Sequence, residues 1–115
     1  MGRDDQPGRT EIPPGTLYML ILKSLARLGP MHGYGIAQYI QQISQEVLQV
    51  EEGSLYPALQ RMLIKGWVVA EWGQSDNNRR ARYYRLTPAG RKQLGSEISE
   101  FEKVTHAIMR VIQPA

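Results

Sequence analysis

The sequence lacks the features that define several other classes of protein. None of its 115 residues is a cysteine, which excludes disulfides and thiolate metal sites and fits a reducing cytoplasm. No apolar run approaches the roughly 20 residues that span a bilayer. The first fifteen residues also lack the hydrophobic segment that a secretory signal needs. We therefore expect a cytoplasmic protein, and the length predicts a single globular unit with its own core.

Catalytic groups are equally sparse. The two histidines, His32 and His106, are far apart, and no carboxylate cluster, metal-ligand spacing or nucleophile motif accompanies them. The pair Gly33 and Gly35 does not form a dinucleotide-binding loop, because Gln38 stands where the third glycine belongs and no strand precedes it. We expect neither an enzyme nor a bound metal or cofactor.

Positive charge is concentrated in the second half of the chain. Residues 53–92 hold eight of the fourteen basic residues and only two acids, Glu71 and Asp76, so this segment carries +6 while the remainder carries −3. The asymmetry favours a polyanionic partner, although a basic cluster can also be an ordinary solvated surface.

Apolar spacing predicts two helices near the start of the chain. Leucines and isoleucines recur at three- and four-residue steps after Thr16, which suits a helix N-cap, and Gly29-Pro30 supplies the stop. A second helix begins near Gly33, where either a phosphate contact or a local helix cap explains His32 and Tyr34. The short run at 47–50 is either a strand or a linker.

A third helix is predicted over residues 53–66. Ser54 is its expected N-cap and Gly66 its C-cap, which makes Pro57 the third helical residue. Proline costs little there, because first-turn amides have no partner within a helix. The small residues Gly53, Ser54 and Pro57 keep this turn thin enough to approach a phosphate backbone.

A hairpin is predicted after the third helix. Residues 67–72 and 82–87 are rich in β-branched and aromatic side chains, and a polar turn with several arginines separates them.

The aromatic residues of this hairpin divide between core and surface. Tyr83 and Tyr84 point to opposite faces of their strand, so we expect one in the core and the other at the surface. Trp67 and Trp72 are expected in the core.

A long helix completes the chain. Thr87 suits its N-cap and Pro88 its first position. Apolar residues at alternating four- and three-residue steps predict a seam for pairing with a second chain. The expected dimerisation residues are Leu94, Ile98, Phe101, Val104, Ile108, Val111 and Ile112.

Three helices, a basic hairpin and a final helix form the layout of a winged helix-turn-helix, a mainly α (α+β) fold. We expect a disordered arm over 1–15, the DNA-binding domain over 16–87 and a C-terminal dimerisation helix over 88–115.

In this layout the third helix enters the major groove of double-stranded DNA and the hairpin reaches the minor groove or flanking phosphates. Tyr56 can instead pack inside. The candidate DNA-binding residues are Ser54, Tyr56, Pro57, Gln60, Arg61, Lys65, Arg79, Arg80, Arg82, His32 and Tyr34. The alternative function is a winged-helix module that binds another protein.

Three ordered motifs, "HGYGI" (32–36), "GSLYPALQRM" with "KGW" (53–67) and "RRARYYRLTPAG" (79–90), resemble the PadR family of bacterial transcriptional regulators. A short final helix is similar to that of the small subfamily with a single C-terminal helix. The resemblance implies a recognition helix at 54–66 and a wing at 73–82.

The resemblance also implies a way of working. It implies a homodimeric repressor at an inverted-repeat operator, often relieved by a small hydrophobic or aromatic effector. Some small members bind flat aromatic molecules with a tryptophan on the last helix, whereas Phe101 is the only aromatic residue on that helix here.

Overall fold

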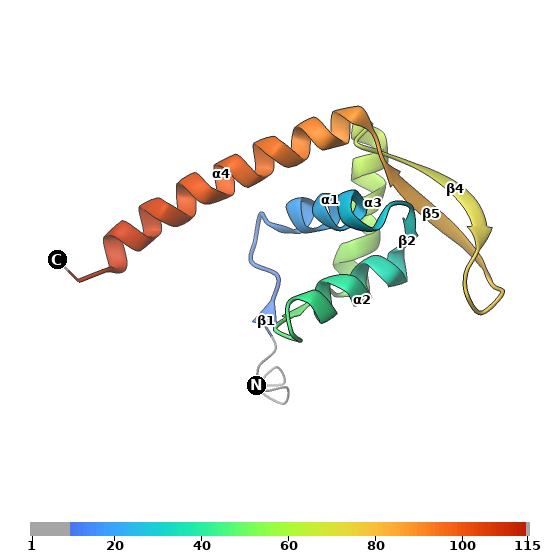
Figure 1. Ribbon diagram of the computed structural model, residues 1–115, viewed down its shortest axis with the longest axis horizontal. Coiled ribbons are helices and arrows are strands. Elements are labelled where there is room, and N and C mark those ends of the chain that lie inside the picture. The colour runs from blue at the N-terminus through green and yellow to red at the C-terminus, as the bar shows by residue number, and fades with distance from the viewer. Residues whose placement is uncertain (1–9, 115) are drawn as a thin grey trace.

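The fold combines four helices with a three-stranded sheet that lies to one side of them, in a computed structural model that describes residues 10–114 (Figure 1). The helices are α1 (Leu17–Leu28), α2 (Gly33–Ile43), α3 (Glu52–Lys65) and α4 (Pro88–Ile112). The strands are β1 (Thr10–Glu11), β2 (Met31–His32), β3 (Leu48–Gln49), β4 (Val68–Gln74) and β5 (Arg80–Leu86). The predicted mainly α winged helix-turn-helix is confirmed.

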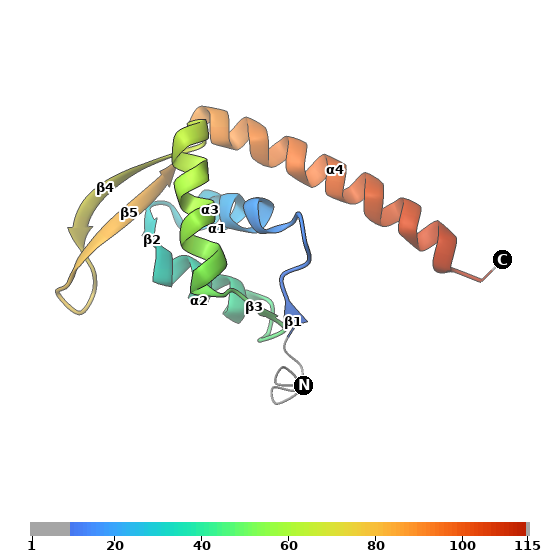
Figure 2. The same ribbon diagram turned by 180° about the vertical axis from the view of Figure 1, so that it is seen from behind.

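The main sheet has the order β2-β5-β4 and is antiparallel throughout. In the hairpin, Val68 pairs with Leu86 and Gln74 with Arg80, so the predicted strands extend slightly further into the turn. The hairpin projects past the helices at one end of the molecule, opposite the free end of α4 (Figures 1 and 2).

Part of the predicted disordered arm is ordered. Residues 1–9 lie outside the described part of the chain, but β1 pairs in parallel with β3, which also decides the open choice at residues 47–50 in favour of a strand. Ile12 then packs against the core. The prediction of disorder is therefore wrong for residues 10–15, because backbone pairing and one apolar side chain hold them.

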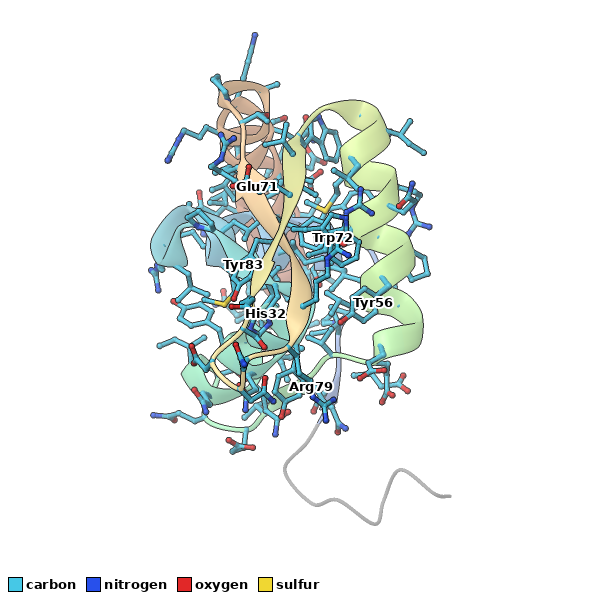
Figure 3. The ribbon with its side chains drawn as sticks, turned by 90° about the vertical axis from the view of Figure 1, so that its right-hand side faces the viewer. His32, Tyr56, Glu71, Trp72, Arg79 and Tyr83 are labelled. Carbon is cyan, nitrogen blue, oxygen red and sulfur yellow. The ribbon has the colours of Figure 1, made fainter. Side chains whose placement is uncertain are left out.

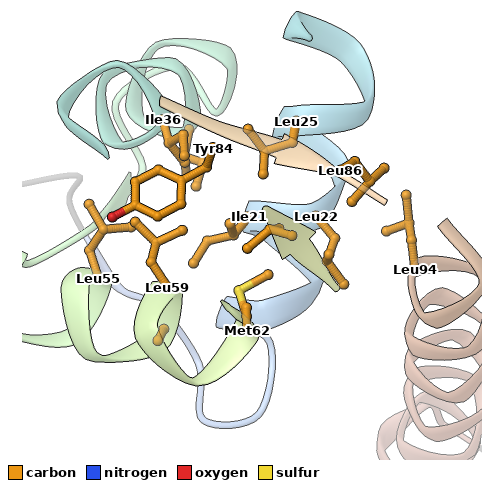
Figure 4. Packing of buried hydrophobic residues seen from close by; sticks show 13 residues of the cluster. Ile21, Leu22, Leu25, Ile36, Leu55, Leu59, Met62, Tyr84, Leu86 and Leu94 are labelled. Atoms are coloured by element: carbon orange, nitrogen blue, oxygen red, sulfur yellow. The ribbon is translucent and has the colours of Figure 1, made fainter. Parts of the chain in front are cut away.

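The core lies where α1, α2 and α3 meet the base of the hairpin. Ile21 and Leu25 of α1, Ile36 of α2 and Leu59 of α3 converge there beside Tyr84 (Figure 4). Each helix contributes an apolar face, although Ile43 at the end of α2 is exposed. Tyr84 is thus the core member of the tyrosine pair, while Tyr83 is half-buried and its hydroxyl donates to the carbonyl oxygen of Gln74 (2.8 Å).

Close packing fixes the start of α4 against the α3–β4 corner. The Thr87 hydroxyl accepts from the Gly90 amide (3.0 Å) and donates to the carbonyl oxygen of Gly66 (2.7 Å), which confirms the predicted cap. A Cβ at Gly90 would lie 2.1 Å from the Trp67 carbonyl oxygen, so only glycine allows this approach. The first turns of α4 are therefore rigidly attached, and the helix then extends away from the body (Figure 1).

Candidate nucleic-acid interface

The exposed face of α3 is the centre of the candidate interface, and α3 is called the recognition helix below. Leu55, Ala58, Leu59 and Met62 are buried, and the opposite face of the helix is open to solvent. At helical spacing this open face carries Gly53, Tyr56, Pro57, Gln60 and Ile64.

The recognition helix begins earlier than predicted. Glu51 is its N-cap, with an extended backbone, and its carbonyl oxygen accepts from the amides of Ser54 (3.0 Å) and Leu55 (2.9 Å). Ser54 is therefore the third helical residue, and the prediction that it caps the helix is wrong. Because the Glu51 carbonyl oxygen accepts the hydrogen bond from the Ser54 amide, Glu52 and Gly53 are the first two residues of the helix.

Pro57 consequently lies in the second helical turn and not in the first. Because Pro57 has no N–H, the Gly53 carbonyl loses its regular helical donor at this point. A Cβ at Gly53 would meet nothing within 4 Å, so no packing requires a glycine there. Two residues that weaken a helix, Gly53 and Pro57, thus lie one turn apart on its exposed face.

Arg61 lies at one edge of the exposed face and is tied to α1. Its Nε donates to the Tyr18 hydroxyl at 2.6 Å, and its guanidinium lies 5.7 Å from the centre of the Tyr18 ring. The hydrogen bond to Tyr18 holds the Arg61 guanidinium in one orientation, so the side chain loses less conformational entropy on binding than a free arginine would.

Tyr56 lies at the other edge, and the structure decides its placement in favour of partial exposure. Its side chain remains 43% exposed, and a Cβ on Gly33 would come within 2.7 Å of its ring. Partial burial raises the pKa of the Tyr56 phenol above its usual value, and Glu52 and Tyr84 raise it further. The phenol therefore stays protonated, and able to donate a hydrogen bond, throughout the physiological pH range.

The start of α2 lies beside Tyr56. His32 is the N-cap of α2, and its Nδ1 accepts from the Gly35 amide (3.0 Å), which supports the cap interpretation of this residue. Its ring also packs edge-on against Tyr83. Tyr34 is 60% exposed, with its hydroxyl within reach of Gln38, so Tyr34 offers a free surface while His32 positions the helix.

The hairpin β4–β5 with its turn, residues 68–86, is called the wing. Its turn is held by hydrogen bonds, since the Ser75 amide donates to the Arg79 carbonyl oxygen (2.8 Å) and the Asn78 amide to that of Ser75 (2.9 Å). Asn78 adopts the left-handed conformation that such a turn needs. The side chains of Arg79, Arg80 and Arg82 are exposed at this end of the wing.

An open groove of about 880 Å³ separates the wing from the starts of α2 and the recognition helix. Figure 3 shows Tyr56 on the recognition helix, Trp72 on the wing and Arg79 at its tip around this region. Among the predicted DNA-binding residues, the groove brings together His32, Tyr34, Tyr56, Arg79, Arg80 and Arg82. Ser54, Pro57 and Arg61 line a neighbouring groove with the β1 segment, and Gln60 and Lys65 are exposed on the recognition helix.

Trp72 is a groove residue that the sequence interpretation missed. The prediction that both tryptophans lie in the core holds for Trp67, which packs against it, and is wrong for Trp72, which is 60% exposed. The alternation along β4 could have shown that Trp72 shares the face of Val68. It could not show that the body of the protein ends before that position is reached.

The second surface feature is an apolar stripe along α4. Leu94 is buried in the chain's own core and Ile98 packs against it, so these two have little surface left for a partner. The rest of the stripe is open to solvent, with Ile108 52% and Val111 82% exposed. Its exposed members are Phe101, Val104, Ile108, Val111 and Ile112.

Within residues 10–114, no group of three or more histidine, aspartate or glutamate side chains could hold a metal ion. In the same part of the chain, none of the helices has the length and apolar character needed to cross a membrane.

Comparison with known proteins identifies a family to which the chain is similar. The family model described as "Transcriptional regulator PadR-like family" matches residues 21–96. A transcriptional regulator of Mycobacterium tuberculosis is 34% identical over 79 residues, covering 69% of this chain and 70% of that protein.

Solved structures agree with this match. A transcriptional regulator from Clostridium thermocellum is 28% identical, with a TM-score of 0.78, and the match covers 86% of this chain and 95% of that one. A PadR-like transcription factor from Bacteroides fragilis is 27% identical, with a TM-score of 0.65 over 84% and 90% of the two chains.

Proposed function

The chain belongs to the PadR-like family of transcriptional regulators, which are DNA-binding proteins and not enzymes, and from this premise we propose that it is a homodimeric repressor. In this proposal each subunit inserts its recognition helix into the major groove at one half of an inverted repeat. The wing lies on the adjacent backbone or minor groove.

The observation that carries the proposal is the pairing of two surfaces at opposite ends of one molecule. One is the recognition face with three exposed wing arginines beside it, and the other is the exposed stripe of α4. Anionic DNA complements the first surface. A second copy of the stripe complements the second, because a C2 dimer joins the same patch on both subunits.

On the recognition helix, Gln60 and Arg61 are the proposed readers of base edges, since glutamine pairs with adenine and arginine with guanine through two hydrogen bonds each. Ser54, Lys65 and the start of the helix are the proposed phosphate contacts, because the amides and dipole of a helix N-terminus attract anions.

Relief by a small hydrophobic or aromatic effector is also part of the proposal. A groove of about 400 Å³ lies between the start of α1 and α4, lined in part by Met19, Phe101 and Val104. Because two of these residues belong to the α4 stripe, a molecule bound there would touch the proposed dimer interface. This position would couple effector binding to the spacing of the two recognition helices.

The proposal is tested by fluorescence anisotropy with two duplexes of equal length, at roughly 50 and 200 mM salt. One duplex is the DNA upstream of this protein's own gene, because many regulators control their own expression, and the other is its shuffled version. We expect tighter binding to the native duplex that survives the higher salt. Equal affinity for both duplexes and for any other polyanion would instead favour the protein-interaction module.

A further inference from the structure

Trp72 is a large apolar side chain left exposed on the wing. It lines the groove with 60% of its surface accessible, although strand β4 begins in the core at Val68. A single exposed apolar residue is common on protein surfaces, so the exposure of Trp72 is informative only together with the arginines and tyrosines that line the same groove.

Strand register explains how Trp72 comes to face the groove. Residues directly opposite each other share a face of the sheet, and the pairs Val68–Leu86 and Ala70–Tyr84 face the core. Trp72 pairs with Arg82 as the next step along the same face. The core-facing side of the sheet thus extends beyond the packed core, and this extension is called the overhang below. Trp72 is the first residue of β4 on this side that does not pack against the core.

Arg80 is fixed on this overhang by Trp72. Its guanidinium lies 4.6 Å from the centre of the Trp72 ring, a cation–π contact between residues two steps apart across the hairpin. A free arginine loses rotamer entropy when it binds a ligand, whereas one held on an aromatic face has already lost part of it. The contact leaves donor groups of Arg80 free, since a guanidinium has five N–H bonds.

The opposite wall of the groove has matching chemistry. Tyr34 and Tyr56 face it with exposed rings, and Gly33 leaves space for the Tyr56 ring by having no Cβ. The charged side chains that line the groove are those of three arginines and one carboxylate, Asp76. A strand of duplex DNA alternates apolar deoxyribose with anionic phosphate. A groove lined by both aromatic rings and arginines therefore suits a DNA strand better than it suits a uniformly apolar partner.

We propose that Trp72 and Arg80 form a preformed backbone clamp in which the indole packs on a deoxyribose and the guanidinium binds the adjacent phosphate. The clamped strand is the one that runs between the wing and the recognition helix. This inference rests on the proposed function and adds a specific role for the wing. It makes Trp72 a positioning residue that acts on every sequence alike.

Tryptophan fluorescence tests the clamp, because the chain has only two tryptophans, Trp67 and Trp72. Trp67→Phe leaves Trp72 as the sole reporter, and Trp72→Phe leaves Trp67, which packs edge-on against Tyr18 away from the groove, as the matched control. Emission and quenching by acrylamide are recorded while the duplex from upstream of the gene is added. Anisotropy of a labelled copy of that duplex reports binding independently, and circular dichroism checks that both variants are folded.

We expect DNA to change the emission of Trp72 and to protect it from acrylamide. Trp67 packs against the core and its ring centre lies 5.2 Å from Lys65 Nζ, so it should show at most a small change in emission and no change in its protection from acrylamide. Trp72→Ala should weaken binding by roughly two- to fivefold for native and shuffled duplexes alike, the loss expected when one exposed cation–π contact disappears. Binding by anisotropy with no change at Trp72 would overturn the clamp and leave the proposed function standing. Failure of every duplex to bind would contradict the proposed function and the clamp together.

Discussion

Single residues on the recognition helix and on the wing are expected to contribute differently to DNA binding. Arg61 is oriented by the Tyr18 hydroxyl at the edge of the recognition face, and Arg80 is held on the Trp72 ring of the wing. The first position suits a base edge in the major groove and the second a phosphate, and these two kinds of contact differ in how they depend on sequence and salt.

Arg80→Ala should weaken binding to native and shuffled duplexes equally and reduce the slope of log affinity against log salt by about 1, because one phosphate contact is lost. Arg61→Ala should cost about 1–3 kcal/mol on the native duplex and relax sequence preference. Anisotropy titrations over a salt series measure both effects.

Arg85→Ala is the matched control, because Arg85 is exposed on the same strand but points away from the groove. It should leave the salt slope as in the parent. An equal loss of slope in Arg80→Ala and Arg85→Ala would show that only the overall charge matters, and the assignment of Arg80 to a phosphate would then be wrong.

At the scale of elements, α4 combines two environments. Its first turns are fixed on the α3–β4 corner through Thr87 and Gly90. Beyond Ile98 the apolar stripe is only partly covered by the start of α1 at Phe101 and Val104, and it is open to solvent at Ile108, Val111 and Ile112. Helices in proteins are stabilised by packing of an apolar face more than by intrinsic propensity, which supports the proposal that a second copy covers this face.

Ile108→Asp should convert the protein from dimer to monomer, because a carboxylate buried in an apolar interface without a partner is strongly unfavourable. Light scattering should therefore give half the mass of the parent. Ser99→Asp introduces the same charge on an exposed position outside the stripe and should leave the mass unchanged. A parent that is itself monomeric, or an Ile108→Asp variant of unchanged mass, would refute dimerisation through α4.

Elements could be predicted from the sequence more reliably than their ends and surroundings. The apolar faces of α1 and α3 and the Thr87-Pro88 start of α4 follow from local patterns, and the structure confirms them. In α2 the pattern holds for Ile36 and Ile40, whereas Ile43 is exposed. The start of α3 did not follow, because a backbone carbonyl at Glu51 makes its first bonds and no side chain signals it.

The exposure of Trp72 could not be predicted for a different reason. Trp72 lies on the same face of β4 as the buried Val68, so the alternation along the strand predicts a core position. Only the tertiary arrangement shows that the wing extends beyond the core at Trp72. The order of β1 likewise depends on pairing with β3, some 38 residues further along the chain, which local patterns do not encode. The predicted DNA contacts and the dimer interface depend on partners and stay predictions.

At the scale of the whole molecule, the geometry separates the proposed DNA-reading surface from the proposed dimer surface. The body with its wing lies at one end of a molecule 55 Å long, and the free half of α4 forms the other end (Figure 2). Two copies joined through α4 would hold two recognition helices at a distance fixed by the dimer. The spacing of the two half-sites on DNA is therefore a direct consequence of the proposed assembly.

Hydroxyl-radical footprinting of the DNA upstream of the gene tests this account most directly, because it reports backbone contacts at single-nucleotide resolution. The account predicts two protected segments related by a two-fold axis, with centres about one helical turn, 10–10.5 base pairs, or a multiple of it apart. Both segments should be lost together in Ile108→Asp. Uniform protection along the duplex, or a single protected segment that survives in the monomeric variant, would contradict the claim of a dimeric, sequence-specific regulator.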